Sequence, residues 1–321
     1  MIVVQGSDDV PAAARGGVLA IGNFDGVHRG HQALIAAAIE EGKRLAAPAG
    51  AIVFEPHPRE FFQPDKPHFR LTPLTRKLAL LEELGLDVAV VVRFDAALAG
   101  LAAEAFIERV LVQGLGVRHV VVGYDFRFGK GRTGDPETLR RAGAAQGIGV
   151  TVVAQVAEAG EVFSSSAIRA ELAQGDVQGA AEMLGHWWRV AGTVVGGAKR
   201  GTGLGYPTAN LTLPSGTALG HGIYAVRVYV DGRRLEGAAY LGTRPTFDDG
   251  EAVLEVFLFD FDGDLYGRQI EVEFIGFVRA DAKFASAAAL QEQMGKDVER
   301  ARQMLGLAPV KPGPAKPGDG G

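Results

Sequence analysis

The chain has 321 residues, of which 47% are hydrophobic and 22% charged, with a formal net charge of -5. This composition is enough for two globular domains and excludes a fibrous or disordered chain. The negative charge argues against nucleic acid or an anionic membrane as the main partner, so small ligands are expected. The absence of cysteine excludes disulfides, thiolate catalysis and cysteine-ligated zinc.

The sequence shows no targeting or membrane segment. The N-terminus has no basic leader followed by a long apolar run, and no stretch has eighteen uninterrupted apolar residues. We therefore expect a cytoplasmic protein.

Short β-branched runs alternate with segments of helical periodicity in the first half of the chain. The predicted strands cover residues 17–22, 51–55, 88–94, 119–123 and 150–154, and the predicted helices cover residues 31–46, 74–84, 104–112 and 136–145. The alternation predicts an α/β domain over residues 1–185, with a Rossmann-like parallel sheet and helices on both faces.

Strand-like segments and turn signals replace the helices after residue 185. We predict a compact antiparallel β-barrel or sandwich over residues 186–308, with a turn at 231–232 and a closing helix at 284–305. That helix carries one apolar stripe made of Leu290, Met294, Val298 and Leu305. Residues 309–321 are too rich in proline and glycine to fold, so we expect a disordered tail.

A cluster of glycines, histidines and an aspartate follows the strand at 17–22 and opens a helix. Loops at the ends of parallel strands line ligand crevices, and a helix N-terminus offers N–H groups to phosphate. Gly30 allows a polyphosphate close to the backbone, while His28 and His31 can donate to oxygens that gain charge during attack on an α-phosphate. We assign catalysis to the two histidines and ATP binding to Gly22, Asn23, Phe24, Asp25 and Gly30.

A second phosphate motif spans residues 163–169, with the sequence Phe-Ser-Ser-Ser-Ala-Ile-Arg. Serines at a helix start can be simple caps, a role compatible with phosphate binding. Arg169 adds a permanent cation suited to ATP phosphates or departing pyrophosphate. The segment resembles a phosphate motif of the nucleotidyltransferase superfamily, which implies catalysis by Arg169 and ATP binding by Ser164, Ser165 and Ser166.

The His-x-Gly-His segment and this serine motif resemble the signatures of the nucleotidyltransferase superfamily, with Phe163 and Ser166 in place of the usual Ile and Thr. The segments at 54–58 and 123–131 resemble the FAD synthetase module of bacterial bifunctional enzymes. The resemblance implies adenylyl transfer to FMN, whose phosphate is already anionic and needs only alignment and charge neutralisation. It implies flavin contacts by His57, Pro58, Asp125, Phe126, Arg127 and Phe128.

A glycine-rich segment at 192–210 ends in Pro-Thr-Ala-Asn and matches neither a Walker A motif nor the protein-kinase signature. The Thr208 hydroxyl and the Asn210 amide are hard oxygen donors suited to Mg²⁺ beside phosphate. The segment resembles the riboflavin kinase motif, which implies that these two residues bind Mg-ATP and that Glu255 is the base for the ribityl hydroxyl. Further implied contacts are to ATP, by Gly197, Lys199, Gly201, Gly205 and Pro207, and to flavin, by Arg279 and Phe284.

The two motif sets follow the order of the bacterial bifunctional riboflavin kinase/FMN adenylyltransferase (FAD synthetase) family, over residues 17–306. The resemblance implies phosphorylation of riboflavin to FMN by ATP, releasing ADP, and then formation of FAD and pyrophosphate, with Mg²⁺ as cofactor. Phe257 stands where that family often has histidine, and Asp281 where glutamate is commoner.

Two alternatives stay open. One is a chain with a single active module, and the other is a non-catalytic flavin-sensing regulator. The regulator should carry a nucleic-acid-reading element, and no helix-turn-helix pattern or basic stripe stands out in the sequence. The sequence leaves homo-oligomerisation open.

Overall fold

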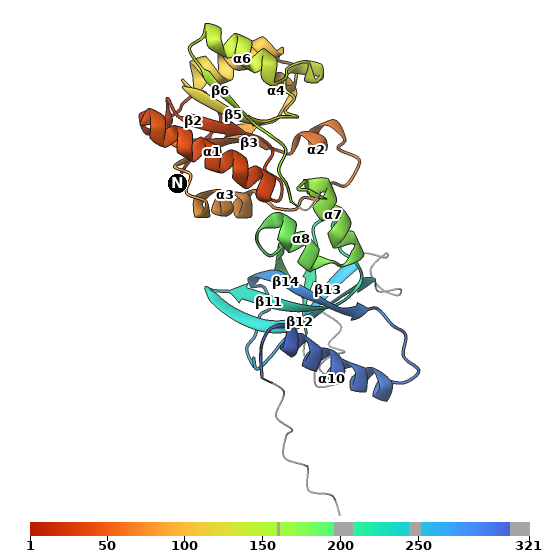
Figure 1. The fold of residues 1–321 in the computed structure, drawn as a ribbon. Helices are drawn as coiled ribbons and strands as arrows, with labels where there is room; N and C mark the ends of the chain where they lie inside the picture. The colour runs from red at the N-terminus through yellow and green to blue at the C-terminus, as the bar shows by residue number, and fades with distance from the viewer. Residues whose placement is uncertain (159–160, 196–207, 244–251, 309–321) are drawn as a thin grey trace, which may run out of the picture. The chain divides into compact units, whose positions relative to one another are not determined.

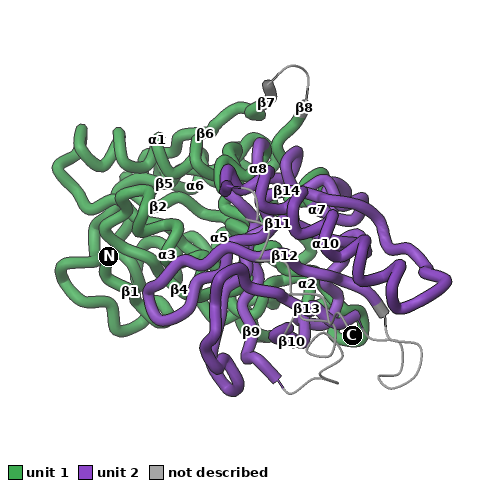
Figure 2. The backbone as a smooth tube through the Cα atoms, turned by 90° about the horizontal axis from the view of Figure 1, so that it is seen from below, with its two compact units in different colours: residues 1–168, 183–186 green, residues 169–182, 187–321 purple. Residues whose placement is uncertain are grey.

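The computed structural model describes residues 1–158, 161–195, 208–243 and 252–308. The chain forms two compact units, which Figure 2 shows in different colours. The first contains residues 1–168 and 183–186, and the second contains residues 169–182 and those from 187 onward. The boundary between the units is therefore not a single position, because residues 169–182 belong to the second unit and residues 183–186 to the first. The predicted tail at 309–321 lies outside the described residues.

A six-stranded parallel sheet is the centre of the first unit, in the order β1-β4-β3-β2-β5-β6. The strands are β1 (Ile2–Gln5), β2 (Val18–Ile21), β3 (Ala49–Glu55), β4 (Val88–Arg93), β5 (His119–Gly123) and β6 (Gly149–Val153). The five predicted strands and the parallel sheet are confirmed. The edge strand β1 was not predicted, because its apolar run is only three residues long and two of those, Ile2 and Val3, are exposed.

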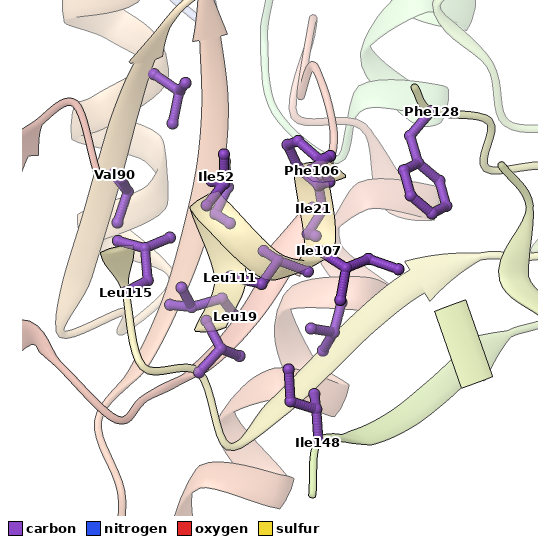
Figure 3. Close-up of a cluster of buried hydrophobic side chains, with 14 of the residues drawn as sticks. Leu19, Ile21, Ile52, Val90, Phe106, Ile107, Leu111, Leu115, Phe128 and Ile148 are labelled. Carbon is purple, nitrogen blue, oxygen red and sulfur yellow. The ribbon is translucent and has the colours of Figure 1, made fainter. Parts of the chain in front are cut away.

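Helices cover both faces of this sheet, as the continuous apolar strands predicted. Helices α1 (Arg29–Leu45) and α3 (Leu74–Glu83) pack on the core that contains Val18 and Ala20. On the other face, α5 (Ala103–Phe106), which continues as a π-helix over Ile107–Gly114, and α6 (Pro136–Ala145) pack on the core that contains Leu19 and Ile21 (Figure 3). Alternate side chains of β2 thus enter opposite cores.

Short elements complete this part of the chain (Figure 1). They are the 3₁₀ turns at Ala12–Ala14 and Lys130–Arg132, α2 (Pro58–Phe62), α4 (Ala96–Ala99), the strand pair β7 (Ala157–Glu158) and β8 (Glu161–Val162), α7 (Ser165–Gln174) and α8 (Val177–Leu184).

The second unit contains a closed barrel in the order β10-β13-β12-β11-β14-β9, in which all neighbours are antiparallel. The strands are β9 (Arg189–Val195), β10 (Thr208–Thr212), β11 (Gly222–Val230), β12 (Arg233–Thr243), β13 (Ala252–Leu258) and β14 (Gln269–Ala280). This confirms the predicted barrel. The predicted turn at Asp231 and Gly232 joins β11 to β12, with φ of 47° and 74°.

The terminal helix α10 (Ala287–Met304) lies against the outside of the barrel and contacts β11, β12 and β14 (Figure 1). It begins three residues later than predicted, because the Ser286 side chain caps it by accepting from the Ala289 N–H. Phe284 therefore precedes the helix. Along β13, Leu254, Val256 and Leu258 are buried, while Glu255 alternates with them and lies on the outer face.

Candidate active sites

Three of the predicted segments meet at one edge of the parallel sheet. The 22–31 segment follows β2, the 54–58 segment ends β3, and the 123–131 segment follows β5, and β2 pairs with both β3 and β5. The strand order reverses between β2 and β5, which makes this edge the topological switch point where open α/β sheets bind ligands.

The loop between β2 and α1 has an unusual backbone. Phe24 and Val27 adopt positive φ of 48° and 45°, which is rare for residues other than glycine. The buried Asp25 carboxylate accepts the N–H groups of Leu71 and Thr72 at 3.0 and 3.2 Å, and the Gly26 N–H donates to the Thr72 hydroxyl. Contacts with residues 71 and 72 therefore fix the loop.

Two residues of this loop that the sequence assigned to ATP have buried side chains. Phe24 is fully buried in the core beside α1, and Asp25 is 3% exposed. Their burial does not support direct ATP contacts by these side chains, which instead anchor the loop. Which side chain of a loop is buried depends on its partners, here Leu71 and Thr72 from 46 or 47 residues away in the chain.

His28 and His31 lie together at the start of α1. Their rings stack with centroids 3.7 Å apart, and His28 caps the helix because its Nδ1 accepts the His31 N–H. Among the described residues, the buried Nδ1 of His31 has no hydrogen-bond partner. Because the Nδ1 of His28 accepts an N–H, the neutral His28 ring carries its proton on Nε2.

Burial keeps both imidazoles neutral. It lowers the pKa of His28 to about 4, against an opposing effect of Asp25. The pKa of His31 is well below its usual value, first because of burial and then because of His28 and Lys77. Near pH 7 both rings are therefore uncharged, and each can present one N–H donor.

A side chain at position 30 would crowd His28. A Cβ there would lie 3.1 Å from the Cε1 and Nδ1 atoms of His28 and 3.4 Å from the Phe163 carbonyl oxygen. Glycine at this position thus permits the stacked histidine pair as well as the close phosphate approach inferred from the sequence.

The serine motif contacts the same loop. The Ser165 hydroxyl donates to the Asp25 carbonyl at 2.8 Å, and the Ser164 hydroxyl accepts the Ala167 N–H as a cap. Ser166 is exposed. Arg169 belongs to the residues grouped with the second unit, so its assignment to ATP phosphates remains a prediction.

His57 and Pro58 begin α2, whose side chains add an aromatic cluster that the sequence analysis missed. The His57 Nδ1 accepts the Arg59 N–H, and burial followed by His68 lowers the pKa of His57 to about 4. Phe62 is 63% exposed, and its ring meets Phe94 edge-on at 5.7 Å. The adjacent phenylalanines 61 and 62 after the Pro-His-Pro turn were the available signal.

The 123–131 segment divides into exposed and supporting residues. Asp125 is exposed and Phe126 is half-buried. Phe128 is buried in the core, where its ring stacks on Phe126 at 5.4 Å, and Arg127 pairs with Asp135 at 3.4 Å. The buried Phe128 ring therefore packs against Phe126 from the side of the core.

Charged residues missed by the sequence analysis also surround the first site. The Lys77 ammonium on α3 is buried and donates to the Asn23 carbonyl at 2.7 Å. Arg70 forms ion pairs with Glu55, at the end of β3, and with Glu60 on α2. Their signal in sequence is weak, because lysine and arginine are common on helix surfaces.

In the barrel, strand register aligns the predicted kinase residues. Asn210 on β10 pairs with Glu255 on β13, and Glu255 pairs with Tyr240 on β12. Residues directly opposite in antiparallel strands share a face, so these three form a row across the outer face of the barrel. Thr208 pairs with Phe257 on the same face.

A cavity of about 350 Å³ lies over Glu255 and Tyr240 of this row, while the buried Asn210 does not line it. It is lined by four residues that the sequence analysis singled out separately: Thr208, Glu255, Arg279 and Phe284. Leu290, Met294 and Val298 of the apolar stripe on α10 form another wall. The cavity therefore combines an apolar wall with hydroxyl, carboxylate and guanidinium groups, as small-molecule sites do.

Two polar contacts shape the rim of this cavity. Asp297 on α10, which the sequence analysis missed, accepts hydrogen bonds from the Arg279 guanidinium at 2.9 and 2.7 Å. These bonds hold the guanidinium carbon of Arg279 5.5 Å from the centroid of the Phe284 ring. The Tyr240 hydroxyl donates to Asp281 at 3.3 Å, and burial raises the pKa of Tyr240 to about 12.

A smaller cavity of about 120 Å³ is lined by Thr208, Ala209, Phe261, Asp264 and Tyr266, among others. Thr208 thus borders both cavities. The predicted ATP residues Gly197, Lys199, Gly201, Gly205 and Pro207 lie outside the described residues.

The described ranges lack two kinds of feature. They contain no helix that is both long and apolar enough to cross a membrane. Nor do those ranges bring together three His, Asp or Glu side chains as a metal site.

The barrel with its mixed cavity and the α/β unit with its histidine pair define a two-module enzyme that transfers phosphorus-containing groups. The FAD synthetase family model matches residues 10–167, and the riboflavin kinase family model matches residues 184–305. The chain belongs to the family of bifunctional riboflavin kinases/FMN adenylyltransferases.

Curated relatives cover nearly the whole chain. The Escherichia coli (strain K12) bifunctional riboflavin kinase/FMN adenylyltransferase is 42% identical over 309 residues, or 96% of this chain and 99% of that protein. The Pseudomonas fluorescens protein of the same name is 42% identical over 305 residues, or 95% and 98%. A crystal structure of a macrolide-efflux protein from Streptococcus pneumoniae superposes with a TM-score of 0.82 at 28% identity, covering 92% of this chain and 97% of that chain.

Proposed function

We propose that this bifunctional enzyme phosphorylates riboflavin on the outer face of the barrel and adenylylates FMN at the β2–β3–β5 edge of the parallel sheet. The observation that carries the assignment is the cavity shared by Thr208, Glu255, Arg279 and Phe284. These four residues come from β10, β13, β14 and the segment before α10.

In the kinase step, the flavin ring occupies the larger cavity against the apolar stripe of α10, and the ribityl chain reaches Glu255. The Glu255 carboxylate accepts the proton of the terminal ribityl hydroxyl. At the same time, the hydroxyl oxygen forms a bond to the γ-phosphorus of ATP. The bond between the γ-phosphorus and the oxygen that bridges to the β-phosphate breaks, and ADP leaves. The position of Thr208 between the two cavities supports a nucleotide in the smaller one.

Mg²⁺ fits the donors on this face. The Thr208 hydroxyl and the Asn210 amide oxygen are hard ligands beside the Glu255 carboxylate, and Mg²⁺ needs only one or two protein ligands when phosphates and waters supply the rest. When bound, the ion would neutralise charge on the transferring phosphoryl group. Thr208 and Asn210 would hold it, which leaves Glu255 for proton transfer.

In the adenylyl-transfer step, an FMN phosphate oxygen bonds to the α-phosphorus of ATP as the bond to the bridging oxygen breaks and pyrophosphate leaves. The ring N–H groups of His28 and His31 donate to oxygens that gain charge, together with N–H groups at the start of α1. No base is needed. The exposed Phe62 at the end of α2 and the half-buried Phe126 in the loop after β5 are the surfaces that we assign to the isoalloxazine ring.

Two variants test this distribution of activities. His28→Ala should lower FAD formation from FMN by about 10²-fold or more, because it removes a donor to the developing charge, and should leave FMN formation from riboflavin intact. Asn210→Ala should do the opposite. Chromatography of the flavin products from riboflavin or FMN, with ATP and Mg²⁺, separates the two reactions.

The exposed His221 provides a matched control. His221→Ala should retain both activities. If His28→Ala or Asn210→Ala removed both activities from a folded protein, the two-site distribution would be wrong. Normal adenylyl transfer in His28→Ala would show that the adenylyl-transfer site does not include His28.

A further inference from the structure

Lys77 is a buried cation without a role in the steps described above. Lys77 is 3% exposed and lies on α3, one turn before Leu80 and Leu81, which pack in the core. A buried ammonium is expensive, so packing alone would favour an aliphatic side chain. The Nζ atom donates to the Asn23 carbonyl at 2.7 Å, and Asn23 belongs to the loop that leads to His28.

Charged groups on several elements face the Lys77 ammonium. They are Asp25 in the β2–α1 loop, Glu55 at the end of β3, Glu60 on α2 and Arg70 before α3. Lys77 in turn acts on the imidazoles of His31 and His57. Since Arg70 is ion-paired with both Glu55 and Glu60, we regard Asp25 as the carboxylate that Lys77 chiefly offsets.

We propose that Lys77 is a positioning residue for adenylyl transfer, which holds the Asn23 carbonyl and offsets the Asp25 charge so that the β2–α1 loop can accept a polyphosphate. The inference rests on the proposed site at His28 and His31. It deepens that assignment by naming the residue that makes the loop electrostatically suitable for ATP.

The physical reason lies in the charges of the site. Both histidines are neutral, so they supply dipoles and no net positive charge. Without the Lys77 charge, the Asp25 carboxylate and the Asn23 carbonyl would repel phosphate oxygens nearby more strongly. In addition, Phe24 and Val27 hold strained positive φ, and strained backbone persists only where its surroundings enforce it. The bond from Lys77 to Asn23 is one such restraint.

Replacement of the charge tests the proposal. Lys77→Met should lower kcat/KM for ATP in FAD formation from FMN by about tenfold or more, since it removes the bond to Asn23 and the charge facing Asp25. Riboflavin kinase activity of the same chain should stay within about twofold, and unchanged hydrogen exchange of the β2 and β3 amides should show that the first unit remains folded. Lys43→Met, at an exposed position on α1, should change neither activity. Unchanged adenylyl transfer in Lys77→Met would overturn the proposal.

Because the chain contains no cysteine, charge can be separated from shape. Lys77→Cys, alkylated with 2-bromoethylamine while unfolded and then refolded, carries an ammonium on a side chain of the same length as lysine. Alkylation with 1-iodopropane gives a neutral side chain of matching shape. With equal kinase activity in both products, only the ammonium form should recover FAD formation. Equal adenylyl transfer in both would show that Lys77 merely fills space.

The His31 imidazole gives a second readout of the Lys77 charge in a variant whose fold, and hence whose burial of His31, is unchanged. Lys77 lowers the pKa of His31, so NMR titration of Lys77→Met should show a higher His31 pKa than the wild type. An unchanged pKa would contradict the electrostatic role. His28→Ala measured alongside separates the two levels of inference: if it loses FAD formation while Lys77→Met does not, the site stands and the role of Lys77 falls.

Discussion

The histidine pair shows how burial sets chemistry at the residue scale. His28 lies 7% exposed at the start of α1, and its low pKa means that it stays uncharged where an exposed histidine would begin to titrate. Neutral donors suit a reaction between two phosphates, because they stabilise charge without a proton that could be lost to FMN.

The same burial predicts a dependence of stability on pH. His28 has a pKa of about 4 in the folded chain and about 6.5 unfolded, so the unfolded state binds the extra proton between these values and stability falls as pH falls. From pH 6.5 to 5 the loss attributable to His28 should be about 2 kcal/mol. Hydrogen exchange of β2 and β3 amides measures it, and His28→Asn should reduce the loss. An equal loss in both proteins would contradict the assignment.

Residue types in a motif were easier to predict than their exposure. The sequence assigned the histidines, Thr208, Asn210 and Glu255 to two candidate sites, since each belongs to a short motif with a chemical meaning, and these assignments stay predictions. The burial of Asp25 and Phe128 could not be predicted, because their partners lie elsewhere in the chain. Lys77 and Asp297 were missed for the same reason.

At the scale of elements, charged residues that pair directly across neighbouring strands join three strands of the barrel. Glu273 on β14 lies between Arg189 on β9 and Arg227 on β11, at 2.7 and 3.4 Å, and it is buried. The hydroxyl of Tyr229 also donates to it. A buried carboxylate with these partners ties the strands together.

Glu273→Gln should therefore lower the free energy of unfolding of the barrel by about 1–3 kcal/mol, because two partly exposed arginines lose their charged partner. Both tryptophans of the chain are at positions 187 and 188, so their fluorescence in a urea titration follows this unit. Glu271→Gln, which removes a more exposed partner of Arg189, should cost less. Equal effects of the two changes would argue against a special role for Glu273.

Periodicity predicted most elements, and local contacts explain the exceptions. The parallel strands are apolar on both faces and stood out in the sequence, whereas β1 is short and its pairing with β4 spans more than 80 residues. The observed start of α10 differs from the predicted start because the Ser286 cap determines where the helix begins. The closure of the barrel between β9 and β10 could not be read from periodicity, which carries no information on strand partners.

On the scale of the whole molecule, two catalytic sites reside in one chain and share FMN as product and substrate. On the proposed assignment, the kinase makes FMN at the barrel and the adenylyltransferase consumes it at the edge of the parallel sheet. The two sites draw on separate sets of residues, so each should work when the other is disabled.

A mixing experiment tests this claim most directly. Glu255→Gln should lose riboflavin phosphorylation by about 10²-fold or more through loss of the base, and it should still convert FMN to FAD. His28→Ala should make FMN and stop there. Given riboflavin, ATP and Mg²⁺, neither variant alone should yield FAD, whereas an equimolar mixture should yield FAD after FMN has accumulated. FAD from riboflavin with either variant alone, at the wild-type rate, would contradict the account.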